Sequence, residues 1–167
     1  TYRIATGGQM FWFAALVNGD DTHAGDVTQS DAGASAMLLQ DISLQNPHDG
    51  DTPTEWTTIG SKSSGKVGSG AFTGTFDGKE KTISDMHITK LDADQARTGL
   101  FASLTGNGCV KDFTIKGSIE LSASNSEKND SGIGGAVGYM RDGGTVTGVT
   151  SVVTITNNGG SNELVHV

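Results

Sequence analysis

Apolar residues beyond position 35 alternate with polar residues at a period of two, which is the spacing of side chains that share one face of a β-strand. Gly, Asn, Asp or Ser interrupts the chain every few residues between these runs. The sequence therefore predicts strands and loops over this whole region. The aligned faces are Leu38, Gln40, Ile42 and Leu44; Phe113, Ile115, Gly117, Ile119 and Leu121; and Val149, Ser151, Val153 and Ile155.

Helical spacing occurs only near the start of the chain. Thr6 followed by Gln9 forms a capping-box pattern, and Asn18-Gly19 is a typical helix stop. The pattern predicts a helix over 6–18. Its buried face would consist of residues spaced i, i+3, i+4 and i+7, namely Met10, Phe13, Ala14 and Val17.

An internal repeat is the most informative feature of the sequence. Residues 99–110 align without a gap with residues 135–146, and the match continues through the following strand. Ile83, Met86 and Ile88 look like a partial earlier copy. In each copy the apolar step is three residues and then two, as expected where a strand bends around a solenoid corner.

The repeat predicts an all-β fold: a right-handed parallel β-helix, or β-solenoid, with an N-terminal capping α-helix. A β-sandwich is the alternative, because its short strands and turns give similar local signals. The fixed offset of the repeat favours the solenoid. We expect a single domain over 1–167, with a cap strand, helix and Asp-rich loop in 1–35 and the coils in 36–167.

Five motifs in this order resemble the signature of the GLUG-repeat proteins: WTTIG at 56–60, FTGTFDG at 72–78, TISDM at 82–86, GLF at 99–101 and GGAVG at 134–138. The resemblance extends over residues 2–155. It implies a right-handed β-helical module of a bacterial secreted or cell-surface protein. Two stretches depart from the family pattern, 20–36 and 45–55, and we expect any function private to this chain to lie there.

The composition makes two classes of partner unfavourable, nucleic acids and anionic membranes. Of the 167 residues, 25 are Gly, and 19 acidic against 11 basic side chains give a net charge of −8. Nucleic acid and anionic membranes would be repelled. The longest apolar run, 10–17, is too short to span a bilayer. The single Cys109 cannot form an internal disulfide and is expected to be a small buried residue.

The start without Met indicates a fragment of a larger protein. The run 163–167 looks like a strand that continues into a further coil or domain.

The carboxylates in the repeats do not predict catalysis. Candidate groups are Asp77, Asp85, Asp112 and Asp142, with His87 and Lys111 nearby in sequence. Asp85 and Asp112 fall at one repeat position, where an Asp caps the backbone of a corner. The chain also lacks the H-E-x-x-H and G-x-S-x-G motifs. We therefore expect a protein that is not an enzyme.

Acidic loops offer oxygen ligands for calcium. Asp49 and Asp51 lie close together after His48, and a second group comprises Asp20, Asp21, Asp26 and Asp31. Neither stretch has the spacing of an EF-hand. The alternative is that these loops are simply solvated.

Aromatic residues indicate a ligand surface, because Trp and Tyr stack on the apolar faces of sugars while their polar tips stay hydrated. Trp12 lies off the predicted core face of the helix, Tyr2 could approach it, and Tyr139 is expected in a loop. Trp12 could instead seal the end of the solenoid, and Trp56 is expected in the core. The sequence thus predicts an extracellular or cell-surface module that binds a glycan or host glycoprotein, or alternatively a structural spacer.

Overall fold

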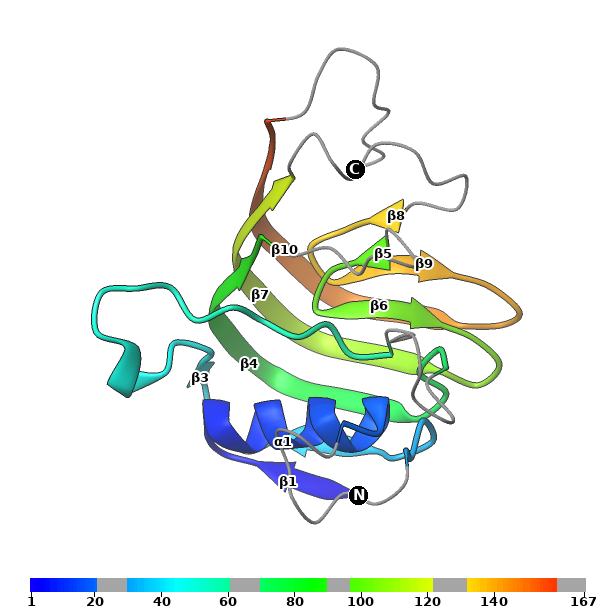
Figure 1. The fold of residues 1–167 in the computed structure, drawn as a ribbon. Helices are drawn as coiled ribbons and strands as arrows, with labels where there is room; N and C mark the ends of the chain where they lie inside the picture. The colour runs from blue at the N-terminus through cyan, green and yellow to red at the C-terminus, as the bar shows by residue number, and fades with distance from the viewer. Residues whose placement is uncertain (21–29, 61–69, 90–96, 122–131, 159–167) are drawn as a thin grey trace.

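The computed structural model describes residues 1–20, 30–60, 70–89, 97–121 and 132–158, and the fold is described for these residues. It is a β-solenoid of about three turns with one short α-helix at its N-terminal end (Figure 1). In chain order the elements are β1 Tyr2–Ile4, α1 Gly7–Asn18, β2 Ala36–Leu38, β3 Ile42–Ser43, a 3-10 helix Pro47–Asp49, β4 Thr75–Ile88, β5 Arg97–Thr98, β6 Phe101–Leu104, β7 Cys109–Leu121, β8 Gly132–Ile133, β9 Val137–Met140 and β10 Thr145–Asn157.

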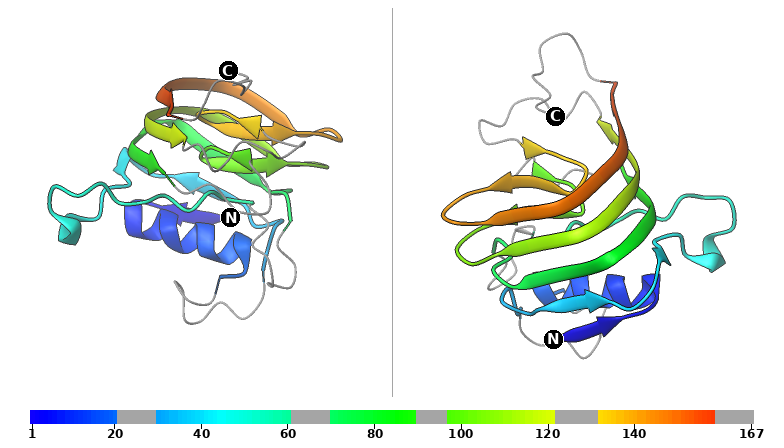
Figure 2. Two further views of the ribbon diagram at one scale, coloured as in Figure 1. Left: turned by 45° about the horizontal axis from the view of Figure 1, so that its top comes forward. Right: turned by 180° about the vertical axis from the view of Figure 1, so that it is seen from behind.

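All strand pairs of the named sheets are parallel. The main sheet has the order β1-β2-β4-β7-β10, and β3 also pairs with β4. The pairs β5–β8 and β6–β9 form two small sheets on the other side of the coils (Figure 2). This arrangement confirms the predicted solenoid and excludes the β-sandwich, which is built from antiparallel sheets.

The predicted repeat is also confirmed. Phe101 pairs with Val137 and Val110 pairs with Val146, each 36 residues later in the chain. The partial copy Ile83, Met86 and Ile88 has the spacing of Val110, Phe113 and Ile115 but not their register, because Ile83 pairs with Ile115. Strand β4 contains two irregularities that add residues relative to β7. The second irregularity lies between Ile83 and Met86, where the apolar step is three residues, so the spacing marks the bulge but does not say which residues of β7 lie opposite it.

Corner residues turn the chain as expected. Asp85 and Asp112 have positive φ values of 61° and 57°. Gly148 lies opposite Asp112 in the next coil and has a φ of 64°. Asp85 and Asp112 do not share a register position, however, since Asp85 sits in a β4 bulge. Asp77-Gly78, a dipeptide typical of turns, lies inside β4, and the positive φ values fall on the next two residues, Lys79 and Glu80.

Helix α1 closes the N-terminal end of the solenoid. Its predicted core residues Met10, Phe13, Ala14 and Val17 are all buried. The Phe13 ring lies 6.2 Å from that of Phe72 and 6.4 Å from that of Phe76, between centroids. A stack of rings continues from there into the coils, because Phe76 contacts both Phe101 and Phe113.

Two inward positions differ from the sequence pattern. Gln40 is exposed, because the chain bends between β2 and β3, and its side chain donates a hydrogen bond to the Ala5 carbonyl oxygen. Cys109 is only partly buried in β7. Trp56 is buried as predicted, at 2% exposure.

The expected strand at 163–167 lies outside the described residues. In the described part of the chain, no helix combines the length and apolar character needed to cross a membrane.

Candidate ligand-binding pocket

The three aromatic residues expected to bind a ligand do not form one site. Tyr2 and Trp12 do meet, with ring centroids 5.4 Å apart, and Tyr2 is 40% exposed. Tyr139 lies in strand β9 rather than in a loop, with the Arg97 guanidinium carbon 3.9 Å from its ring centroid. Strands β1 and β9 belong to opposite ends of the stack of coils (Figure 1).

The proposed metal ligand Asp49 has a role in its own loop. One carboxylate oxygen accepts a hydrogen bond from the Asn46 amide at 3.1 Å, and the other accepts one from the Thr54 hydroxyl at 2.7 Å. Asp51 is exposed. Across the described ranges, no group of three or more His, Cys, Asp or Glu could hold a metal ion. Asp21 and Asp26 lie outside those ranges, and calcium binding stays a prediction.

The carboxylates weighed for catalysis have structural partners. Asp77 forms ion pairs with Lys79 at 2.9 Å and Lys111 at 3.2 Å. Burial by itself would raise the pKa of Asp77, but the hydrogen bonds from the two lysines outweigh it and hold the pKa below its usual value. His87 Nδ1 lies 3.0 Å from the Ser118 hydroxyl. The contacts of Asp77 with Lys111 and of His87 with Ser118 join strand β4 to strand β7 of the next coil. The absence of enzymatic activity stays a prediction.

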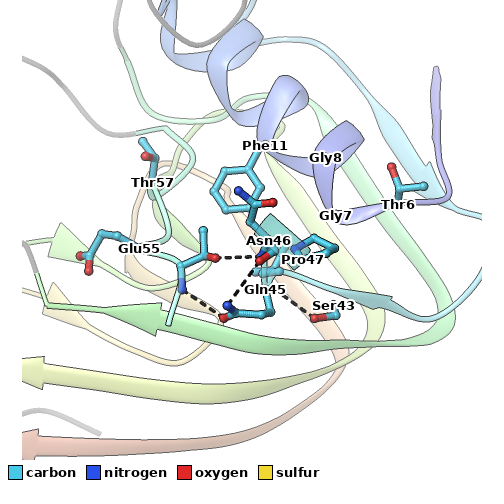
Figure 3. A pocket seen from close by; sticks show the side chains of 12 residues that line it. Thr6, Gly7, Gly8, Phe11, Ser43, Gln45, Asn46, Pro47, Glu55 and Thr57 are labelled. Carbon is cyan, nitrogen blue, oxygen red and sulfur yellow. Dashed lines mark hydrogen bonds between the residues drawn. The ribbon is translucent and has the colours of Figure 1, made fainter. Parts of the chain in front are cut away.

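A pocket of about 650 Å³ opens between the N-terminus of α1 and the segment 43–57 (Figure 3). Phe11, Leu44 and Pro47 supply its apolar surface, and Phe11 reaches from the helix towards the segment. The polar lining comes mainly from side chains of the segment. The lining residues are Thr6, Gly7, Gly8, Phe11, Ser43, Leu44, Gln45, Asn46, Pro47, Thr54, Glu55 and Thr57.

The beginning of the helix positions one wall of this pocket. The Thr6 hydroxyl accepts a hydrogen bond from the Gln9 backbone N–H, and the Gln9 side chain accepts one from the Ala5 N–H. A Cβ added to Gly7 would collide with the Ser43 carbonyl oxygen. Glycine at the first helical position therefore lets α1 begin directly against strand β3.

The opposite wall is held by its own hydrogen bonds. The Gln45 side chain donates to the Thr52 carbonyl oxygen at 2.8 Å and accepts from the Thr54 N–H at 3.1 Å. The Glu55 carboxylate accepts two hydrogen bonds of 2.8 Å from Thr89, one from its backbone N–H and one from its hydroxyl. Because these groups are fixed by neighbours within the protein, the wall keeps its shape without a ligand.

Part of this pocket falls in a stretch that the sequence marks. Residues 45–55 depart from the GLUG pattern and supply five of the twelve lining residues. Phe11, Gly7 and Gly8 were missed, because the helix was judged only by the face that it buries. Two adjacent glycines at a helix start were the available signal, since glycine there allows close backbone approach.

Comparisons with known proteins gave one partial similarity. Halomucin from Haloquadratum walsbyi is 36% identical over 88 residues, which cover 53% of this chain but about 1% of halomucin. No family model matches the chain. No solved structure matches it.

Proposed function

We propose that this chain is a non-enzymatic binding module of a surface or secreted protein, and that it holds a carbohydrate in the pocket between α1 and segment 43–57. The observation that supports the proposal is the pocket itself, with its apolar floor and polar rim. A concave, largely preformed site with a few polar groups is the usual form of a small-ligand site.

The lining favours a sugar over a purely apolar ligand. Phe11 offers an aromatic ring for the CH face of a pyranose. The Thr57 hydroxyl lies at the rim together with Asn46, whose side-chain NH₂ group has a second N–H besides the one that it donates to Asp49. Such groups can donate to and accept from sugar hydroxyls.

The partial identity with halomucin supports the surface or secreted location. The resemblance to GLUG-repeat proteins points the same way and stays a prediction, as does a bacterial origin. A glycan or a glycoprotein remains the proposed partner.

A structural spacer is the second candidate function. It is favoured by the regular 36-residue register of the last two coils, which could continue into further coils of the same kind. A spacer needs no pocket, so binding measurements distinguish the two candidates.

The first experiment is a glycan-array screen with wild-type protein, with and without calcium. It should be accompanied by two pocket variants, Gly8→Leu and Phe11→Ala. A side chain at Gly8 has room, since the nearest atom to its Cβ would be the Thr6 hydroxyl oxygen at 3.9 Å. Gly8→Leu thus fills the pocket without removing a hydrogen bond. Trp12→Ala is the matched control on the same helix, next to the pocket residue Phe11.

We expect binding that both pocket variants reduce at least tenfold and that Trp12→Ala leaves unchanged. Circular dichroism would check that each variant is folded. Binding lost in Trp12→Ala but kept in Gly8→Leu would move the site to the Tyr2–Trp12 pair. Wild-type protein that binds no glycan would contradict the proposal and favour the spacer.

A further inference from the structure

One wall of the pocket depends on a residue that does not line it. Asp49 belongs to the 3-10 helix within segment 43–57 and is exposed to solvent. One of its carboxylate oxygens accepts a hydrogen bond from the Asn46 side chain at 3.1 Å, and the other accepts one from the Thr54 hydroxyl at 2.7 Å. Both donors line the pocket, so Asp49 joins two lining residues that lie 8 positions apart in the chain.

The three residues form a closed ring of hydrogen bonds. While the Thr54 hydroxyl donates to Asp49, its oxygen accepts from the Asn46 backbone N–H at 2.8 Å. The Asp49 backbone N–H donates to the Asn46 carbonyl oxygen at 3.0 Å. Because each residue bonds to the other two, the position of each depends on both of the others.

The orientation of the Asn46 side-chain amide follows from these contacts. Its oxygen accepts a hydrogen bond from the His48 backbone N–H at 3.1 Å, and its NH₂ group donates to Asp49. With the amide turned over, an NH₂ group would face the His48 N–H and an oxygen would face the Asp49 carboxylate, and neither pair could bond. Asn46 therefore offers a ligand the second N–H of its NH₂ group, and a ligand atom that bonds there has to be an acceptor.

We propose that Asp49 is a positioning residue of the pocket, which holds Asn46 so that its second N–H donates to an acceptor oxygen of the sugar. The inference rests on the proposed function, because it requires a sugar in the pocket (Figure 3). Sugar hydroxyl, ring and carbonyl oxygens can all accept such a bond. Asp49 acts through Asn46, since it is not itself among the lining residues.

The glycan array, repeated over a dilution series of protein, tests this role with Asp49→Ala and Asp51→Ala. Asp51 is the matched control, because it is exposed in the same segment, does not line the pocket and carries the same charge. We expect Asp49→Ala to weaken binding about fivefold, as the loss of one hydrogen bond would, and Asp51→Ala to leave it unchanged. Binding that needs calcium and falls in both variants would assign Asp49 to a calcium site and overturn the proposal.

A double-mutant cycle with Asn46→Ala separates a positioning role from a general loss of stability. If Asp49 acts through Asn46, then Asp49→Ala should weaken binding much less in the Asn46→Ala background than in wild type. Circular dichroism checks that all three variants are folded. Losses that multiply in the double variant would show that Asp49 acts independently of Asn46, which contradicts the proposal.

Hydrogen exchange of the free protein separates a failure of this inference from a failure of the proposed function. The backbone N–H groups of Asn46 and Thr54 are both hydrogen-bonded within the segment. Asp49→Ala should speed their exchange, and Asp51→Ala should not. Wild-type binding that Asp49→Ala leaves unchanged, with unchanged exchange, would overturn this inference alone. Wild-type protein that binds no glycan would overturn the proposed function and, with it, the role of Asp49 towards a sugar.

Discussion

Asp85 illustrates how single residues stabilise the corners of this solenoid. Its φ of 61° is a conformation that Asp and Asn tolerate better than most residues. Its carboxylate accepts hydrogen bonds from the Ser43 hydroxyl at 2.6 Å and the Ser84 hydroxyl at 2.7 Å. The Ser43 contact links strands β3 and β4. Asp85 therefore lies at a corner, as expected. Its carboxylate, however, accepts hydrogen bonds from side chains, whereas the sequence analysis expected it to cap the backbone.

These hydrogen bonds predict a dependence of stability on pH. The Ser43 bond, then the Ser84 bond, lower the pKa of Asp85 against a smaller opposing effect of burial. A lowered folded-state pKa means that the stabilisation is present above the unfolded value of about 3.9 and is lost as pH falls through the folded value. Asp85→Asn should lose about 1 kcal/mol at pH 7, a typical hydrogen-bond contribution.

Urea unfolding of both proteins between pH 2 and pH 7 measures this effect. The difference between wild type and Asp85→Asn should shrink as the pH falls below about 4, because the Asp85 carboxyl group then gains a proton in the unfolded chain before it does so in the folded protein. A difference that stays constant across this range would show that the carboxylate charge contributes nothing.

At the scale of elements, helix α1 begins and ends at the capping residues that the sequence predicts. Thr6 caps its start, and Gly19, with a φ of 68°, ends it. The N–H groups of Gly19 and Asp20 donate to the carbonyl oxygens of Leu16 and Ala15, which is a Schellman motif. The predicted helix boundaries are therefore confirmed, because both signals act within a few residues.

Asn18 attaches the helix to the coils, a role that the sequence did not reveal. Its side chain is 4% exposed, donates to the Thr58 carbonyl oxygen at 3.0 Å and accepts from the Gly60 N–H at 2.8 Å. Asn18→Ala would leave both backbone groups buried without a partner. We expect the free energy of unfolding to fall by about 2–4 kcal/mol.

Chemical denaturation measures this loss, and Asn107→Ala is the control because Asn107 is exposed in a turn. The control should change stability by less than about 0.5 kcal/mol. Equal losses in the two variants would mean that the Asn18 hydrogen bonds do not anchor the helix.

On the scale of the whole molecule, inward side chains of β10 are less buried than their partners in β7, as Val146 and Val110 show. The same side chain at the same place in successive coils should therefore contribute differently to stability. Val110→Ala removes two methyl groups from a fully buried site and should cost about 2 kcal/mol. Val146→Ala, at 39% exposure, should cost less than about 1 kcal/mol.

Urea denaturation of wild type and the two variants measures both costs. Equal costs would show that Val146 is covered in solution as completely as Val110.

The sequence by itself determined the type of structure: strands of period two, one capped helix, and coils repeating every 36 residues. These features depend on side-chain direction and backbone sterics within a few residues, so they are visible in the order of residues. Asp85 and Asp112 could be recognised as corner residues for the same reason, but their alignment with each other was predicted wrongly.

Only the tertiary structure decided the register of β4, the burial of Asn18 and the pocket between α1 and segment 43–57. Each depends on which distant segments meet. Bulges in β4 shift its partners in β7, and Gly7 meets Ser43 only because β3 lies beside the helix start. Such contacts are set by packing over the whole chain, and spacing within one segment cannot specify them.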